Sequence, residues 1–270
     1  MSQETAVVLG PGGMLGTAWM AGLVAGLRRE GLDLAQADLI VGTSAGAIVG
    51  AALAAGHDLE RLAVLPDPDG EPAAKTDHER LGQAFAVLND SALEPAAALR
   101  RVGRLALAAE TGAEEAYLAR MEFLIGGREW PQGRRLMIPA VDVESGEPLV
   151  WTASSGVALV AAVASSSAFP GSAPPITING RRYMDGALRS GTNADLAEGA
   201  RAAIVVEPLA HLFPADTPAH GAVVRLAPDP AAQEALGVDL GNRAAWSPVY
   251  QAGLRQAPEA AKLIEPVWVR

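Results

Sequence analysis

The feature that most constrains the fold of this chain is a G-x-S-x-G pentapeptide, GTSAG, at positions 42–46. An apolar run, Asp38 to Val41, precedes it, and an alanine-rich helical pattern, Ala45 to Ala55, follows it. Such a junction predicts a strand, a sharp turn and a helix, because the glycines remove the Cβ atoms that would clash in the turn. Ser44 is then lifted off the sheet edge, where its hydroxyl can attack an ester. A glycine-rich turn without chemistry has the same pattern, so other segments must decide between the two.

A similar unit opens the chain. Ala6 to Leu9 reads as a buried strand, Gly10 to Gly13 as a glycine-rich turn, and about Thr17 to Arg29 as a helix. Two strand–helix units in succession favour a parallel sheet that is covered by helices and joined by right-handed crossovers. We therefore expect an α/β fold.

Beyond this opening we expect an insertion and then further strands. From Pro66 to about Lys75 the composition shifts to Pro, Asp, Gly and Glu, and three helical patterns follow as far as Ile125. We read residues from about 66 to 130 as a helical insert in a single domain that covers 1–270. Asn179-Gly180 is a strong hairpin signal, so the sheet is expected to be mixed. Expected strands cover 136–141, 149–152, 176–178, 182–184, 203–206 and 223–226, and expected helices lie near 231 and over 244–263.

Charge and composition exclude several classes of protein. The 270 residues carry a net charge of −10, which argues against a nucleic acid as the main partner. The absence of cysteine rules out disulfides, thiolate metal sites and a thiol nucleophile. No apolar run approaches the roughly 20 residues that span a bilayer, and the first residues lack the pattern of a signal peptide. We therefore expect a cytoplasmic protein.

Acyl transfer by a serine needs a nucleophile, a base for its proton and donors for the oxyanion. Ser44 is the candidate nucleophile. The turn from Gly10 to Gly16 is the candidate source of donors, because glycines let backbone N–H groups approach a ligand and the turn opens a helix. Pro11 has no N–H and cannot donate.

Two kinds of base are compatible with the sequence. Asp185 stands before Gly186 at the end of the second hairpin strand, although Asp-Gly is also an ordinary turn pair. A histidine is the alternative, in the chain order Ser, Asp, His, and only His211 and His220 follow Asp185. Both lie in a segment rich in Pro and Ala, where surface residues are expected.

The turn from Gly10 to Gly16 also matches G-x-G-x-x-x-G, a loose variant of a dinucleotide-binding turn. A dinucleotide site wants an acidic residue at the end of the next strand, about 20 residues on, to bind the ribose. Val41 to Ser44 occupy that position, so a nucleotide-dependent oxidoreductase lacks its ribose anchor here.

Four blocks in order make this chain resemble the patatin-like phospholipases of bacterial type. The resemblance covers most of residues 6 to 200 except the insert. It implies a three-layer α/β/α fold with a mainly parallel, mixed central sheet. It also implies a hydrolase of phospholipids or other acyl esters that needs no metal or cofactor, with transient contact with a membrane or micelle surface. The blocks are Pro11–Leu23, Gly42–Gly46, Ala164–Pro170 with Pro174-Pro175 beyond, and Asp185–Ala187 followed by Asn193–Ala197.

The resemblance further implies a Ser-Asp dyad without a catalytic histidine. Carried over to this sequence, Ser44 is the nucleophile and Asp185 the base, and the backbone of Gly12, Gly13 and Met14 forms the oxyanion hole. The dyad is physically coherent if Asp185 is partly desolvated, because exclusion of water raises the basicity of a carboxylate.

Two positions depart from the family pattern, which usually reads Gly-Gly-Gly-x-Arg-Gly where this chain has Pro11 to Gly16. Leu15 replaces the arginine, which would favour less polar substrates, and Pro11 removes one donor but stiffens the turn. The alternative function is therefore a weakly active or non-catalytic protein that binds lipid or acyl ligands on the same fold. The apolar stripes between Leu81 and Ile125 either pack on the domain or form a lid over a lipid entry.

Overall fold

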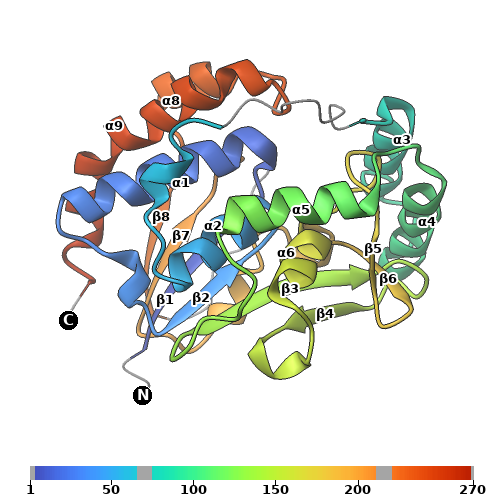
Figure 1. Ribbon diagram of the computed structural model, residues 1–270, viewed down its shortest axis with the longest axis horizontal. Helices are drawn as coiled ribbons and strands as arrows, with labels where there is room; N and C mark the ends of the chain where they lie inside the picture. The colour runs from blue at the N-terminus through green and yellow to red at the C-terminus, as the bar shows by residue number, and fades with distance from the viewer. Residues whose placement is uncertain (1–3, 66–74, 211–220, 269–270) are drawn as a thin grey trace.

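The strands expected from the sequence form one mixed sheet in a computed structural model that describes residues 4–65, 75–210 and 221–268 (Figure 1). Within these residues the sheet has eight strands in the order β5-β6-β3-β2-β1-β7-β8, and β4 pairs with β3. The strands are β1 (Thr5–Leu9), β2 (Leu39–Gly42), β3 (Arg135–Asp142), β4 (Pro148–Trp151), β5 (Ile176–Ile178), β6 (Arg181–Asp185), β7 (Ala202–Val206) and β8 (Ala222–Leu226).

Parallel pairing dominates the centre of the sheet. β1 lies between β2 and β7. The parallel pairs are β3 with β2, β2 with β1, β1 with β7, and β7 with β8. The antiparallel pairs are β3 with β4, β3 with β6, and β5 with β6. The expectation of a mainly parallel, mixed sheet is confirmed. β1, β2 and β7 are buried along their whole length, which explains why they read as continuous apolar runs rather than alternating ones.

One face of the sheet carries a continuous layer of helices (Figure 1). α1 and α9 pack side by side at very short range, which Gly22 and Gly253 permit. A Cβ added at Gly22 would lie 2.0 Å from the Tyr250 backbone oxygen, and one added at Gly253 would lie 2.1 Å from the Trp19 backbone oxygen. The C-terminal helix therefore packs within the chain, against α1. The helices of this layer are α1 (Gly13–Arg29), α2 (Ala45–Ala54), α5 (Glu114–Ile125), α6 (Leu159–Ser166), α8 (Pro230–Leu236) and α9 (Trp246–Ile264).

The opposite face is covered in two parts. Small residues of the segment 194–200 pack against Ala6, Val8 and Val41, and the helices α3 and α4 pack against Val141 and Met184. The sheet therefore lies between two helical layers, as the three-layer expectation requires. The elements of the second layer are α7 (Ala187–Ser190), the 3₁₀ turn η4 (Ala194–Ala197), α3 (His78–Leu88) and α4 (Pro95–Ala108).

The structure differs from the sequence-based expectation mainly at the start of α1. The helix begins at Gly13, four residues before the expected Thr17. Glycines have low helix propensity, so the first turn gives no helical signal; it is held by the Thr17 hydroxyl, which donates to the Gly13 oxygen at 3.0 Å. The three expected helical patterns are α3, α4 and α5, whereas residues 66–74 lie outside the described residues. None of the helices in the described ranges is long and apolar enough to cross a membrane.

Candidate active site

The turn between β2 and α2 holds Ser44 in a strained backbone conformation. Ser44 has a φ of 55° and a ψ of −118°, a backbone conformation that residues other than glycine rarely adopt. A Cβ at Gly42 would lie 2.5 Å from the Gly46 oxygen, and one at Gly46 would lie 1.9 Å from the Leu9 oxygen. Both glycines are therefore required by close backbone approach. The turn rests on the end of β1, because the Thr43 N–H donates to the same Leu9 oxygen at 2.9 Å.

Asp185 reaches Ser44 because of the topology of the mixed sheet. β2 runs parallel to the first half of β3, pairing Val41 with Met137, and β6 runs antiparallel to the second half, pairing Asp185 with Ala140. The carboxyl ends of β2 and β6 therefore point toward each other. There the Ser44 hydroxyl donates to Asp185 Oδ2 at 2.7 Å, so the structure brings the two predicted side chains together.

The Asp185 carboxylate is almost completely buried. It is 1% exposed, and burial raises its pKa to about 7, against the opposing effect of its hydrogen bonds from the Ala187 N–H and the Ser44 hydroxyl. The Ala187 N–H donates to Oδ1 at 2.8 Å and leaves Oδ2 for the serine. Asp185 is therefore an oriented carboxylate that can take up a proton near neutral pH.

The end of α6 binds Ser44 and the residue that follows Asp185, a link that was not predicted from the sequence. The Ser44 N–H donates to the Ser166 hydroxyl at 3.1 Å, and the Ser167 hydroxyl donates to the Ser44 oxygen at 3.1 Å. The Gly186 N–H donates to the Ser166 oxygen at 3.1 Å. Ser166 thus links the residue that carries the hydroxyl to the residue after the carboxylate. The run of three serines was the only signal in the sequence, and it does not say what the hydroxyls contact.

Two helices from the expected insert border the site. The Tyr117 hydroxyl of α5 donates to the Ser167 oxygen at 2.7 Å, and burial raises the pKa of Tyr117 above its usual value. Phe85 of α3 stacks on Phe169, with ring centroids 5.2 Å apart, and remains 39% exposed. Apolar and aromatic side chains therefore lie beside the segment that holds the serine.

The glycine-rich turn presents backbone donors at the N-terminus of α1. In the described parts of the chain, no acceptor binds the N–H groups of Gly12, Gly13 and Met14, whereas the Leu15 N–H donates to the Leu240 oxygen at 3.2 Å. Gly13 has a φ of 61°, which favours glycine. The three predicted donors are therefore available to an anionic oxygen, and the partial positive charge of the helix terminus favours one.

The alternative base, a histidine after Asp185, falls outside the part of the chain that the structure describes. His211 and His220 lie outside the described residues. A cavity of about 460 Å³ lies at the end of α2 that is remote from Ser44, where Ala55, His57 and Trp130 help to line it. Trp130 therefore lines a cavity that does not include the Ser44–Asp185 pair.

A family model described as patatin-like phospholipase matches residues 7–198 of this sequence. The chain therefore belongs to the patatin-like phospholipase family, as the four blocks predicted. The matched region contains all five of the residues predicted to act, and the family is one of lipid acyl hydrolases. Within that family the Leu15 side chain of this chain, at the position where an arginine is usual, is fully buried and packs into the core.

Comparison with other proteins gives low identities. A search of curated proteins found no match. Among solved structures, VipD from Legionella pneumophila is 13% identical with a TM-score of 0.48, and the alignment covers 97% of this chain and 67% of VipD. The type III effector protein ExoU is 16% identical with a TM-score of 0.38, and the alignment covers 96% of this chain and 54% of ExoU.

Proposed function

We propose that this protein is a serine acyl hydrolase that cleaves the carboxylic ester bonds of phospholipids or other acyl lipids through a Ser44–Asp185 dyad. The observation that carries the proposal is the 2.7 Å hydrogen bond from the Ser44 hydroxyl to a buried carboxylate whose pKa is about 7. A serine is a weak nucleophile until a base removes its proton, and a base works best when its pKa lies near the working pH.

In the first half of the reaction, Ser44 Oγ attacks the ester carbonyl carbon while its proton passes to Asp185 Oδ2. The negative charge that develops on the carbonyl oxygen is bound by the N–H groups of Gly12, Gly13 and Met14. When the tetrahedral intermediate collapses, Asp185 returns the proton to the leaving alcohol, and the acyl group stays on Ser44.

In the second half, Asp185 takes a proton from a water molecule, which attacks the acyl carbonyl. The same backbone donors bind the second oxyanion, the bond to Ser44 Oγ breaks, and the serine recovers its proton from Asp185. No histidine is required, because one carboxylate serves as the base in both halves and as the acid in each collapse.

Two features of the site favour an apolar substrate. The buried Leu15 offers no cation to an anionic head group, and the Phe85–Phe169 stack lies beside the segment that holds Ser44. We therefore propose that the acyl chain is recognised more strongly than the head group, with the substrate drawn from a membrane or micelle surface.

The test is hydrolysis of p-nitrophenyl esters from acetate to palmitate, and of phospholipid in mixed micelles, by the wild-type protein and Ser44→Ala. The proposal predicts turnover by wild type alone, with a preference for longer chains. If wild type does not exceed folded Ser44→Ala on any of these esters, the proposal fails, and the non-catalytic lipid-binding alternative takes its place.

A further inference from the structure

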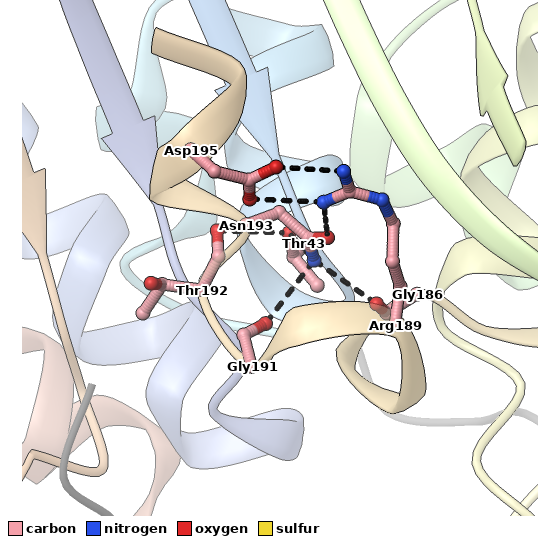
Figure 2. Close-up of polar contacts among 7 residues, drawn as sticks. All are labelled: Thr43, Gly186, Arg189, Gly191, Thr192, Asn193 and Asp195. Carbon is pink, nitrogen blue, oxygen red and sulfur yellow. Dashed lines mark hydrogen bonds and ion pairs between the residues drawn. The ribbon is translucent and has the colours of Figure 1, made fainter. Parts of the chain in front are cut away.

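Asn193 is a completely buried side chain. It binds Thr43 and Gly186, which come from two different segments of the chain (Figure 2). Its Nδ2 atom donates to Thr43 Oγ1 at 3.1 Å, to the Gly186 oxygen at 3.0 Å and to the Gly191 oxygen at 3.2 Å. These acceptors belong to two segments that are far apart in the sequence, so the amide holds the two segments together.

The two segments end next to the reacting side chains. Thr43 directly precedes Ser44, and Gly186 directly follows Asp185. β2 and β6 each pair with β3 and share no ladder with one another, so the sheet alone does not fix the separation of their ends. A side chain that binds Thr43 and Gly186 at once acts on that separation directly.

The orientation of the amide is fixed by charge. Asn193 Oδ1 accepts from Arg189 Nη1 at 2.7 Å, and Arg189 also binds both oxygens of Asp195, at 2.9 Å and 2.6 Å (Figure 2). A guanidinium can only donate, so the oxygen of the amide must face Arg189 and the nitrogen must face the three acceptors. The left-handed backbone of Asn193, with a φ of 57°, is one that asparagine tolerates well.

We propose that Asn193 is a positioning residue that sets the distance between Ser44 and Asp185 through Thr43 and Gly186. This inference rests on the proposed function, because the distance matters to catalysis only if the pair reacts. Ser166 links Ser44 to Gly186 from the α6 side, and the Asn193 side chain, just before η4, links Thr43 to Gly186, so two bridges hold the pair. Misplacing reacting groups by about 1 Å can lower a rate about 100-fold.

The sharpest test is Thr43→Val, which keeps the shape of the side chain but removes Oγ1, both as the acceptor for Asn193 and as the donor to the Thr192 oxygen at 3.3 Å. Asn193 keeps its two backbone acceptors. The expected result is a fall in kcat of about 10- to 100-fold on a soluble ester, with KM nearly unchanged. Thr43→Ser restores the hydroxyl and should restore kcat. Asn193→Gly, which keeps the left-handed backbone, should lower kcat similarly. The double variant should have a kcat only slightly lower than either single variant, because both changes break the same bridge.

A matched control is Thr5→Val, which removes a buried threonine hydroxyl bound to Asp38 Oδ2 at 3.1 Å, at the start of β1. It should lower the melting temperature without lowering kcat. A residue that is only structural would behave in the same way at position 43. If folded Thr43→Val and Asn193→Gly keep the wild-type kcat, the inference is overturned.

A second readout does not depend on turnover. The hydrogen bond from Ser44 lowers the pKa of Asp185. If the bridge fails, this bond is lost, so the pKa of Asp185 should rise in Thr43→Val and stay unchanged in Thr5→Val. Titration of the Asp185 carboxyl carbon by NMR measures this. If wild type hydrolyses no ester, the proposed function fails while this titration still tests the bridge; an unchanged pKa in Thr43→Val would refute it.

Discussion

The backbone of Ser44 is bonded on both sides inside the protein, whereas the three N–H groups of the glycine-rich turn have no acceptor among the described residues. The N–H and carbonyl of Ser44 are bound by Ser166 and Ser167, and its hydroxyl by Asp185. At the turn, the Gly10 N–H donates to the Val206 oxygen and the Leu15 N–H to the Leu240 oxygen, so the unpaired groups of Gly12, Gly13 and Met14 lie between two bound ones. The two halves of the site therefore meet different requirements.

The difference follows from what each half has to do. On the proposed mechanism, Ser44 and Asp185 exchange a proton and need a fixed separation, which we propose is set by the hydrogen bonds of Ser166 and Asn193. Donors for an oxyanion must be left unpaired until the substrate arrives, and their geometry must come from the backbone itself. The predictions below test these two halves in order of expected effect.

The largest effect should come from Asp185→Asn, which keeps the shape of the side chain but removes the base. We expect kcat to fall about 10³- to 10⁴-fold, as when the aspartate of a Ser-His-Asp triad is replaced by a neutral residue. Steady-state kinetics on a soluble ester gives the value. Asp33→Asn, at the cap of a remote 3₁₀ turn, is the control and should keep the wild-type rate. A rate for Asp185→Asn within about tenfold of wild type would show that another group is the base.

The second effect tests the glycine-rich turn through Gly13→Ala. Alanine at a φ of 61° strains the backbone and would re-aim the N–H groups of the turn, so kcat should fall about 100-fold, as on loss of an oxyanion donor. Gly31→Ala, just beyond the other end of α1 at a φ of 87°, imposes a similar strain with nothing within 4 Å of its Cβ. Equal losses of activity in the two variants would mean that the effect comes from stability alone.

The third effect is the pH dependence of the rate. Because the base must be ionised and burial raises the pKa of Asp185 to about 7, kcat/KM should fall about tenfold for each pH unit below 7. A pH–rate profile measures this limb. A flat profile down to pH 5 would contradict the assignment of a buried base.

The same carboxylate predicts how stability changes with pH. Between about pH 4 and 7 folded Asp185 binds a proton that the unfolded chain has released, so its contribution to stability falls as the pH rises through this window. Asp185→Asn lacks this contribution. The melting temperature of wild type relative to Asp185→Asn should therefore decrease from pH 4 to 7 and then level off.

The smallest effect should come from Ser166→Ala, which leaves the Ser44 N–H without its acceptor. One bridge through Asn193 remains, so we expect kcat to fall only about tenfold, with a loss of stability of about 1–3 kcal/mol. Ser172→Ala removes a hydroxyl of the same segment that binds the Phe169 oxygen and does not touch Ser44. A loss in Ser172→Ala as large as in Ser166→Ala would show that general loosening of the segment is responsible.

Local patterns predicted the fold well. The G-x-S-x-G turn, the apolar runs and the Asn179-Gly180 hairpin are encoded within a few residues, and each is confirmed in the structure. The pairing of Ser44 with Asp185 followed from the family blocks, although their catalytic roles remain predictions.

The supports of the site could not be predicted in the same way. Ser166 lies 122 residues from Ser44, and Asn193 lies 150 residues from Thr43, so no local pattern links the partners. Their contacts depend on long-range pairing, such as that of β6 with β3, which brings the segments together. A serine run or a buried asparagine has no distinctive signal of its own, because both residue types are common in turns.

The most direct test of the central claim is covalent labelling with an alkyl fluorophosphonate, followed by mass spectrometry of the digested protein. The label requires an activated serine, which attacks phosphorus and displaces fluoride. We predict one phosphonylated peptide, carrying the group on Ser44, that is absent from Ser44→Ala and strongly slowed in Asp185→Asn. A folded wild-type protein that is not labelled at Ser44, or that is labelled as fast when Asp185 is neutralised, would contradict the account.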